Sequence, residues 1–315
     1  MDGSVKGFVG LGGNFVRAVP ETHLVEAAWS DLQLTVQIAT KLNRSHLIHG
    51  KVAYLLPCRG RIEIDRQATG PQSVTTEDST GCMHGSRGVT EPASPHLLSE
   101  QAILGGIAKA LLPPNPTTDW DRWMDDYSLI RDEIAAIFPE IFHDFNARMW
   151  TPGGFRRPLP AAKREWKTPN GKANFKTPRS FDEDPDVHTD DPKVLRLMTI
   201  RSDDQFNTTV YTLNDRFRGV FGTRRVLLMN TVDIARLGFK IGDHVTVFAV
   251  ARDQDTVSRS VEGLRVTSYD IPRGCAAGYY PECNPLIPLW HHAEGSFVPA
   301  AKAIPVRLQI CTNTV

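Results

Sequence analysis

The sequence lacks the features that mark several common protein classes. No apolar run reaches the about 20 residues that a membrane helix needs, and no basic region followed by an apolar core marks a secretory signal. The five cysteines form no Cys-x-x-Cys pair, which argues against a disulfide framework or a cysteine-ligated iron–sulfur cluster. Neither charge is in excess, because 36 Lys and Arg residues balance 36 Asp and Glu residues. We therefore expect a soluble, cytoplasmic protein without nucleic-acid or membrane partners.

The first 60 residues have the pattern of an α/β domain. Apolar strands are predicted at Val5–Val9, Leu32–Ile38 and Ala53–Leu56, with one helix at Glu21–Ser30. This order favours a doubly wound parallel sheet, which binds ligands at the carboxyl ends of its strands. Because the first strand begins within a few residues of Met1, we expect the sheet to be partial and the chain to be truncated.

A helical connector is predicted to follow this sheet. Residues 61–98 are rich in turn residues, with one short β run at Arg61–Asp65. Apolar periodicity then predicts a helix over Ser99–Leu111 and a second helix from Asp119 to about Phe138. Residues 139–180 show little periodicity.

A change of pattern near residue 193 predicts a second domain. Residues 182–192 are acidic and interrupted by proline, as in a solvated linker. Short strands separated by Gly and Asp turns follow and predict a closed β-barrel. The sequence thus predicts an α/β domain with its connector over 1–181, a linker over 182–192 and a mostly β domain over 193–315.

Several motifs together resemble a known family. The polar cluster Arg201–Thr209 directly follows the apolar strand Val194–Ile200, and polar or glycine-rich turns follow the other strands. The remaining motifs are the glycine turn in Val5–Asn14, the segments Thr40–His46 and Ala53–Cys58, the run Trp166–Phe175, the capped helix and turn in Asn230–Val245, and the closing turns Tyr280–Leu286 and Pro299–Lys302. They resemble the later part of molybdopterin-guanine-dinucleotide oxidoreductases, particularly the formate dehydrogenase alpha-subunit-like branch.

The resemblance implies a fold, a cofactor and a reaction class. It implies a double-psi β-barrel and a molybdenum bis(molybdopterin guanine dinucleotide) cofactor, with electron transfer at molybdenum and a small-molecule redox substrate. The protein sets the orientation and electrostatics of such a cofactor. In the family, the protein or solvent ligand of molybdenum is supplied far upstream, so we assign no catalytic residue and expect this chain alone to be incomplete and inactive. Its partner would be the missing N-terminal part of the enzyme, and any iron–sulfur cluster would lie outside this chain.

Candidate cofactor contacts follow from residue chemistry and from the motif match. Glycines admit backbone amides to a pyrophosphate, Lys and Arg balance its charge, and side-chain amides and hydroxyls read the edges of heterocycles. No metal site is assigned, because the adjacent His291 and His292 would point to opposite faces of a strand. The predicted cofactor-binding residues are Gly12, Gly13, Asn14, Thr40, Lys41, Arg201, Ser202, Gln205, Phe206, Asn207, Thr208, Asn284 and Lys302.

Two other interpretations fit parts of the pattern. A non-catalytic dinucleotide-binding protein or molybdenum-cofactor carrier would use the same pockets without redox turnover. A double-psi barrel of another class would share the Gly242-Asp243 turn, which we interpret as barrel architecture. The glycine-rich loop at 81–88 resembles the approach to the family's active centre, and its Arg87 could contact an anionic substrate or a cofactor phosphate.

Overall fold

The computed structural model describes residues 2–177, 180, 191–252 and 255–311. It forms two compact units: unit 1 comprises Met1–Gln37, Leu42–Leu55 and Pro178–Val315, and unit 2 comprises Ile38–Lys41 and Leu56–Thr177. This division differs from the one predicted at 182–192, a segment of which all but the last two residues lie outside the described residues. Each unit is described by itself.

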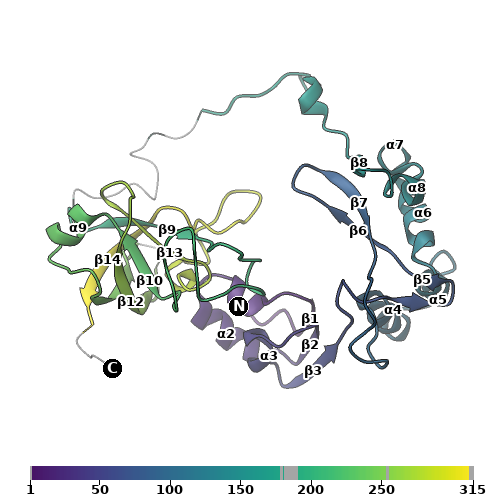
Figure 1. Ribbon diagram of the computed structural model, residues 1–315, viewed down its shortest axis with the longest axis horizontal. Helices are drawn as coiled ribbons and strands as arrows, with labels where there is room; N and C mark the ends of the chain where they lie inside the picture. Colours follow the sequence, from purple (N-terminus) through teal and green to yellow (C-terminus); the bar gives the residue numbers. More distant parts are fainter. Residues whose placement is uncertain (1, 178–179, 181–190, 253–254, 312–315) are drawn as a thin grey trace. The chain divides into compact units, whose positions relative to one another are not determined.

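Six strands of unit 1 close into a barrel, drawn in green to yellow in Figure 1. The strands follow each other around the barrel in the order β10-β12-β11-β14-β9-β13. β10 is parallel to β12 and β13 is parallel to β9, whereas the other pairs are antiparallel. Their bounds are β9 Leu195–Ile200, β10 Val226–Met229, β11 His244–Ala249, β12 Ser260–Ser268, β13 Cys275–Tyr279 and β14 Ile304–Ile310. The closed barrel expected from the short-strand pattern is confirmed.

Alternating side chains of the barrel strands build its core. In β9, Leu195, Leu197 and Thr199 are buried, while Arg196 and Met198, which alternate with them, are exposed. This is the two-residue period of a strand with one buried face. The same core includes Val245 and Val247 of β11 and Leu264 of β12.

The connection between β10 and β11 folds as its sequence predicts. Asn230 caps the short helix α9 (Thr231–Arg236) by accepting a hydrogen bond from the Val232 amide at 2.9 Å. Gly238 and Gly242 then take left-handed conformations with φ of 79° and 96°. The helix therefore stops at a glycine, and a Gly-Asp turn leads into β11.

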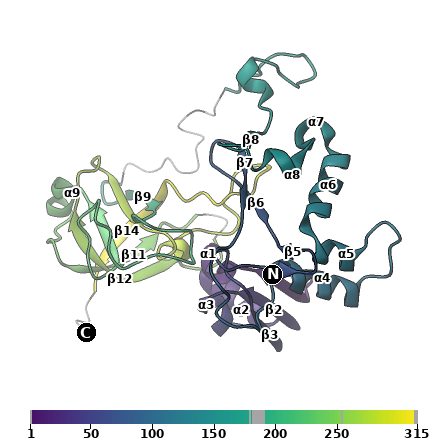
Figure 2. The same cartoon turned by 45° about the vertical axis from the view of Figure 1, so that its right-hand side comes forward.

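The first segment of the chain forms a three-stranded sheet in the order β1-β2-β3 (Figure 2). Its elements are β1 Gly7–Leu11, α1 Phe15–Ala18, α2 Thr22–Ser30, β2 Leu34–Ala39, α3 Arg44–Leu47 and β3 Val52–Pro57. The three predicted strands and the predicted helix are present, with ends shifted by one to two residues. The division between the units passes through this sheet, after Gln37 in β2 and after Leu55 in β3.

Buried polar contacts join this segment to the barrel within unit 1. Glu21 begins α2 in a left-handed conformation, with φ of 48°, and its carboxylate accepts hydrogen bonds from Arg259 at 2.6 and 2.9 Å. The other Glu21 carboxylate oxygen accepts from the Leu289 amide at 2.8 Å. Buried charges need such pairing, so these bonds fix residues at the start of the chain on the barrel.

Unit 2 contains most of the helices and two small sheets, β4-β5 and β6-β7-β8. Helices α4 to α8 cluster together in Figure 1. The elements are β4 Arg66–Gln67, β5 Gly70–Pro71, β6 Val74–Glu77, β7 Cys82–Ser86, α4 Glu100–Leu111, α5 Trp120–Asp125, α6 Tyr127–Ile137, α7 Pro139–Phe142, α8 Phe145–Arg148, β8 Phe155–Arg156 and the 3-10 helix η1 Pro160–Lys163. No helix in the described residues is long and apolar enough to cross a membrane.

Unit 2 differs from the sequence prediction in three places. The strand predicted at Arg61–Asp65 is wrong, since Glu63 makes only an isolated bridge with Thr90. The Glu63 carboxylate accepts hydrogen bonds from the amide of Gly60, three residues before it, and from that of Ala93, 30 residues after it. The helix predicted to run to Phe138 is broken at Asp126, whose side chain caps α6. The hairpin of β6 and β7 was not predicted, because its residues are mostly polar.

Candidate functional site

Unit 1 contains a groove at the end of β1, with a volume of about 510 Å³. Two predicted segments line it together, Gly12–Asn14 and Phe206–Thr208, although they lie almost 200 positions apart in the sequence. The groove is lined by Phe8, Val9, Gly10, Leu11, Gly12, Gly13, Asn14, Phe15, Ala18, Phe206, Asn207, Thr208, Thr209 and Tyr280.

Glycines shape the wall of this groove after β1. Gly12 and Gly13 have φ of 66° and 72°, which residues with a side chain rarely adopt. A Cβ added at Gly13 would meet nothing within 4 Å, so its backbone borders open space. At Gly10, a Cβ would come within 2.6 Å of Gln37 Oε1. These glycines let the chain turn sharply and leave the groove open.

Asn14 holds the two walls of the groove together. Its side chain is buried, and Nδ2 donates to the carbonyl of Thr208 at 3.1 Å. Its Oδ1 accepts from the Ser45 hydroxyl at 2.8 Å and from the Ser45 amide at 3.2 Å. Thr208 in turn donates from its hydroxyl to the carbonyl of Asn14 at 3.4 Å. Asn14 and Thr208 were both predicted as cofactor contacts, and the side chains of both form hydrogen bonds within the protein.

Hydrogen bonds of Ser202, Gln205 and Arg224 fix the conformation of the loop that carries Phe206. Gln205 donates from Nε2 to the carbonyls of Asn207 and Tyr280 at 2.8 and 2.7 Å. Its Oε1 accepts from the amide of Ser202 at 2.9 Å. Arg224 donates to the Ser202 hydroxyl at 2.6 Å and to Gln205 Oε1 at 3.1 Å. Ser202 and Gln205 thus shape the loop, and sequence reasoning missed Arg224.

Three of the predicted residues have exposed side chains at or beside the groove. Phe206 is 70% exposed. Asn207 is exposed with φ of 48°, and its side-chain amide has no hydrogen-bond partner within the described residues. Arg201 is exposed, and its guanidinium lies 5.9 Å from the centre of the Tyr280 ring. Burial raises the pKa of Tyr280, and Arg201 opposes that shift.

The remaining predicted residues lie elsewhere. Asn284 is buried and donates to three carbonyls at the end of α1, the nearest at 3.0 Å. Lys302 donates to the carbonyl of Thr199 at 2.6 Å. Thr40 and Lys41 are exposed and belong to unit 2, and Thr40 lines a pocket there.

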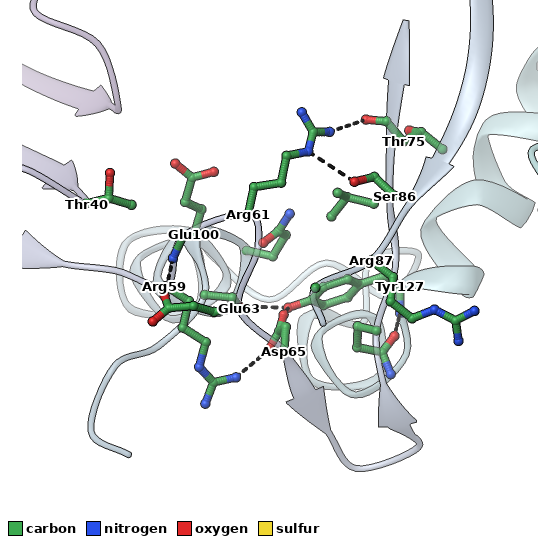
Figure 3. A pocket seen from close by; sticks show the side chains of 16 residues that line it. Thr40, Arg59, Arg61, Glu63, Asp65, Thr75, Ser86, Arg87, Glu100 and Tyr127 are labelled. Carbon is green, nitrogen blue, oxygen red and sulfur yellow. Dashed lines mark hydrogen bonds and ion pairs between the residues drawn. The ribbon is translucent and has the colours of Figure 1, made fainter. Parts of the chain in front are cut away.

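That pocket of unit 2 has a volume of about 450 Å³ and is shown in Figure 3. Asp65 is its most heavily bonded group: it accepts from Arg59 and Tyr127 at 2.6 Å each and from Gln67 at 2.7 Å. Burial raises the pKa of Tyr127, and the hydrogen bond to Asp65 adds to that shift. Tyr127 therefore stays protonated and serves as a donor.

Most other charges of the pocket are also paired within the protein. The amides of Gly60 and Ala93 hold the pKa of Glu63 below its usual range. Arg61 donates to the Ser86 hydroxyl and to the carbonyl of Thr75 (Figure 3). The guanidinium of Arg87 lies over the ring of Trp150 at 5.1 Å. The groove of unit 1 is the stronger candidate because two predicted segments line it together, whereas Thr40 alone among the predicted residues lines the unit 2 pocket.

No metal-binding cluster accompanies either cavity. Among the residues that the structure describes, no group of three or more His, Cys, Asp or Glu side chains is placed to hold a metal ion. The cysteines of the described residues are free thiols. The chemistry offered by the unit 1 groove is therefore that of aromatic faces, amides and backbone groups.

Comparisons with known proteins give relatives and a shared fold. No protein-family model matches the sequence. The chain is 44% identical over 312 residues to an uncharacterized oxidoreductase of Mycobacterium tuberculosis, covering 98% of this chain and 39% of that protein. It is 41% identical over 307 residues to Protein YdeP of Escherichia coli strain K12, covering 98% of this chain and 40% of that protein. The chain thus spans about two fifths of the length of these curated relatives.

A solved structure shares the fold at low sequence identity. The acetylene hydratase from Pelobacter acetylenicus superposes with a TM-score of 0.64 and 15% identity, covering 97% of this chain and 44% of that chain. At this identity the likeness shows the fold alone. The relative from Mycobacterium tuberculosis thus connects the chain to a protein named an oxidoreductase, and the solved structure adds the shared fold.

Proposed function

We propose that the chain is part of a molybdopterin-dependent oxidoreductase of the formate dehydrogenase alpha-subunit-like type, and that unit 1 binds molybdopterin guanine dinucleotide. One observation carries the proposal: the groove at the end of β1 brings the Gly12–Gly13 turn against the Phe206–Thr208 loop. Both segments belong to the set of motifs on which the resemblance rests. The relatives named oxidoreductases add support. The proposal includes a double-psi barrel, a partial doubly wound parallel sheet and a cytoplasmic location.

The groups along the groove fit a flat heterocycle. Phe206 and Tyr280 offer aromatic faces, and the side-chain amide of Asn207 can both donate and accept. Guanine and pterin carry hydrogen-bond donors and acceptors along their edges, with which such an amide can pair.

The groove can also accept a pyrophosphate. The backbone of Gly12 and Gly13 can approach phosphate oxygens closely, because neither residue has a side chain. Arg201, close to the ring of the groove residue Tyr280, supplies an exposed cation beside the groove. A guanidinium suits phosphate because it can donate two parallel hydrogen bonds. We assign it this role ahead of Lys302, which already donates to a backbone carbonyl.

In this proposal the chain binds and orients the cofactor, and none of its residues has a catalytic role. The bound group would supply redox chemistry at molybdenum. The glycine turn and the Phe206 loop would hold the dinucleotide end in place, and their aromatic side chains would keep water from its faces. Because the chain spans about two fifths of its relatives' length, the substrate, electron acceptor and turnover belong to a longer protein in this proposal.

A non-catalytic cofactor carrier is the second candidate. Of the residues that line the groove, Tyr280 alone has a titratable side chain, so the groove needs no turnover to serve as a binding site. A protein that carries the cofactor would transfer it to an acceptor enzyme. A protein that works as part of an oxidoreductase would retain it and change its redox state when a viologen dye is added.

Guanosine diphosphate is a suitable probe of the groove. We expect calorimetry to show that the purified protein binds it, and mass spectrometry to show a pterin released on denaturation. The variant Gly13→Ala should bind the probe at least about tenfold more weakly, because its methyl group enters the open groove and its backbone is strained. Gly295→Ala is the matched control, since Gly295 also has a positive φ and open space around it. Absence of both guanosine diphosphate binding and released pterin would contradict the proposed function.

A further inference from the structure

The wall of the groove depends on an arginine that does not line it. Arg224 precedes β10 and is 3% exposed. Its guanidinium lies close to two aromatic rings, 4.4 Å from the centre of Tyr211 and 4.7 Å from that of Tyr279. Cation–π attraction to both rings restrains the arginine. Its plane, and hence the direction of its five N–H groups, is therefore fixed.

The N–H groups of Arg224 connect three segments around the groove loop. Nη1 donates to the Ser202 hydroxyl at 2.6 Å, and Nη2 donates to Gln205 Oε1 at 3.1 Å and to the Tyr280 carbonyl at 2.8 Å. Glu282 accepts from Nε at 2.9 Å and from Nη2 at 3.2 Å, which balances the buried charge. Arg224 thus ties Ser202 and Gln205, which precede Phe206 in the loop, to the segment Tyr280–Glu282.

Gln205 links Arg224 to the wall of the groove through its hydrogen bonds. Its amide donates to the carbonyl of Asn207, which forms part of the groove wall, and to the carbonyl of Tyr280. Phe206 and Asn207 themselves are exposed, and Asn207 is in a left-handed conformation that costs free energy unless its surroundings impose it. The bonds of Asn14 with Thr208 and the bridge between Phe206 and Val210 hold the far side of the loop, and Arg224 holds the side at Ser202 and Gln205.

We propose that Arg224 is a positioning residue that orders the Phe206–Thr208 wall before a ligand binds. This inference rests on the proposed function for its ligand, and on the structure alone for the order of the loop. A wall that is ordered in advance binds more tightly, because the ligand does not have to order it. Removing Arg224 should therefore weaken binding without removing any group that touches the ligand.

The test variant is Arg224→Met/Glu282→Gln, which removes the guanidinium without leaving a buried carboxylate unpaired. Glu282→Gln alone retains the contacts of Arg224 with the loop. Arg236→Met is a second control, because Arg236 also pairs with a buried carboxylate, that of Asp233, and contacts no residue of the groove loop. If the double variant does not fold, Arg224→Lys serves in its place, since it keeps the charge beside Glu282 and loses the planar fork.

Hydrogen exchange without ligand tests the loop half of the inference, namely that Arg224 orders the loop. In the double variant, amides over 203–212 should exchange at least about tenfold faster, which corresponds to about 1.4 kcal/mol, while those of β9 and β11 stay at the wild-type rate. Both controls should retain the wild-type rate over 203–212. Unchanged exchange over 203–212 in a folded double variant would overturn the inference.

Binding of guanosine diphosphate tests the ligand half, namely that the ordered loop strengthens binding. We expect about tenfold weaker binding by the double variant and wild-type affinity in Arg236→Met. Equal affinity in the double variant and the wild type would overturn the positioning role. Failure of the wild type itself to bind would instead contradict the proposed function and the ligand half with it, while the exchange result would still decide the order of the loop.

Discussion

Asn14 and Asn207 both belong to the groove, yet the structure predicts opposite consequences for their replacement. Asn14 is buried and its amide is fully bonded within the protein, to Thr208 and Ser45. Asn207 is exposed and its amide is unpaired within the described residues. Replacing Asn14 should therefore lower the free energy of unfolding, whereas replacing Asn207 should lower the affinity for a ligand.

The size of the first effect follows from the hydrogen bonds that are lost. Asn14→Ala removes three bonds and leaves the carbonyl of Thr208 and the amide and hydroxyl of Ser45 without these partners. Each bond contributes about 1 kcal/mol net, and a buried group left unpaired costs about 1–3 kcal/mol. We therefore expect a loss of about 2–4 kcal/mol. Asn207→Gly should stay within about 0.5 kcal/mol of the wild type, because glycine accepts a φ of 48° without strain.

Urea titration measures this difference directly. Fluorescence can follow unit 1 through Trp29, which is 5% exposed and packs on Phe8 and Phe15 of the groove. The same two variants are then titrated with guanosine diphosphate, where Asn207→Gly should bind more weakly than the wild type. A loss below about 1 kcal/mol in Asn14→Ala would refute the reasoning, since it would mean that the buried bonds of Asn14 contribute little.

Two further predictions concern packing and thiol chemistry. Gly88→Ala should destabilise unit 2 by about 1–3 kcal/mol or more, because the added Cβ would lie 1.9 Å from the backbone carbonyl oxygen of Glu63. Gly106→Ala in α4, where a Cβ meets nothing within 4 Å, should instead stabilise it by about 0.5–1 kcal/mol, as thermal unfolding of both variants would show. Burial raises the pKa of Cys58 to about 11 and that of Cys283 to about 12, so the reactive thiolate is scarce at pH 8. Mass spectrometry after alkylation of the native protein should find these two cysteines unmodified while the three half-buried cysteines react, and early labelling of Cys283 would contradict its burial.

Much of the fold could be predicted from local sequence patterns. The alternation in β9, the Asn230 cap of α9 and the glycine stops each depend on residues close together in the chain, so each is visible in the sequence. At the strand predicted at Arg61–Asp65, Glu63 instead contacts the distant residues Thr90 and Ala93, through an isolated bridge and a side-chain hydrogen bond. A local residue pattern does not show which distant segment will lie beside it.

The candidate site was predictable as a set of segments and not as a set of contacts. The glycine turn and the polar loop were identified from their types and positions, and the structure brings both to one groove. The roles of individual residues depend on burial, which neighbours far along the chain decide. Arg224 and Arg225 are adjacent and chemically identical, yet Arg224 is buried in a network of hydrogen bonds and Arg225 is exposed. No local pattern distinguishes them.

The pairing of Glu21 with Arg259 has a consequence for the order of synthesis. These residues are 238 positions apart, and Asn14 and Thr208 are 194 apart. At about 5–20 residues per second on a ribosome, the first segment would wait about 10–50 s for its partners. During that interval the apolar side chains of β1 and α2 would lack the barrel residues that complete unit 1. Folding of this unit can therefore finish only after the last barrel strands have been made, and chaperones that shield nascent chains would have their longest task at the beginning of this sequence.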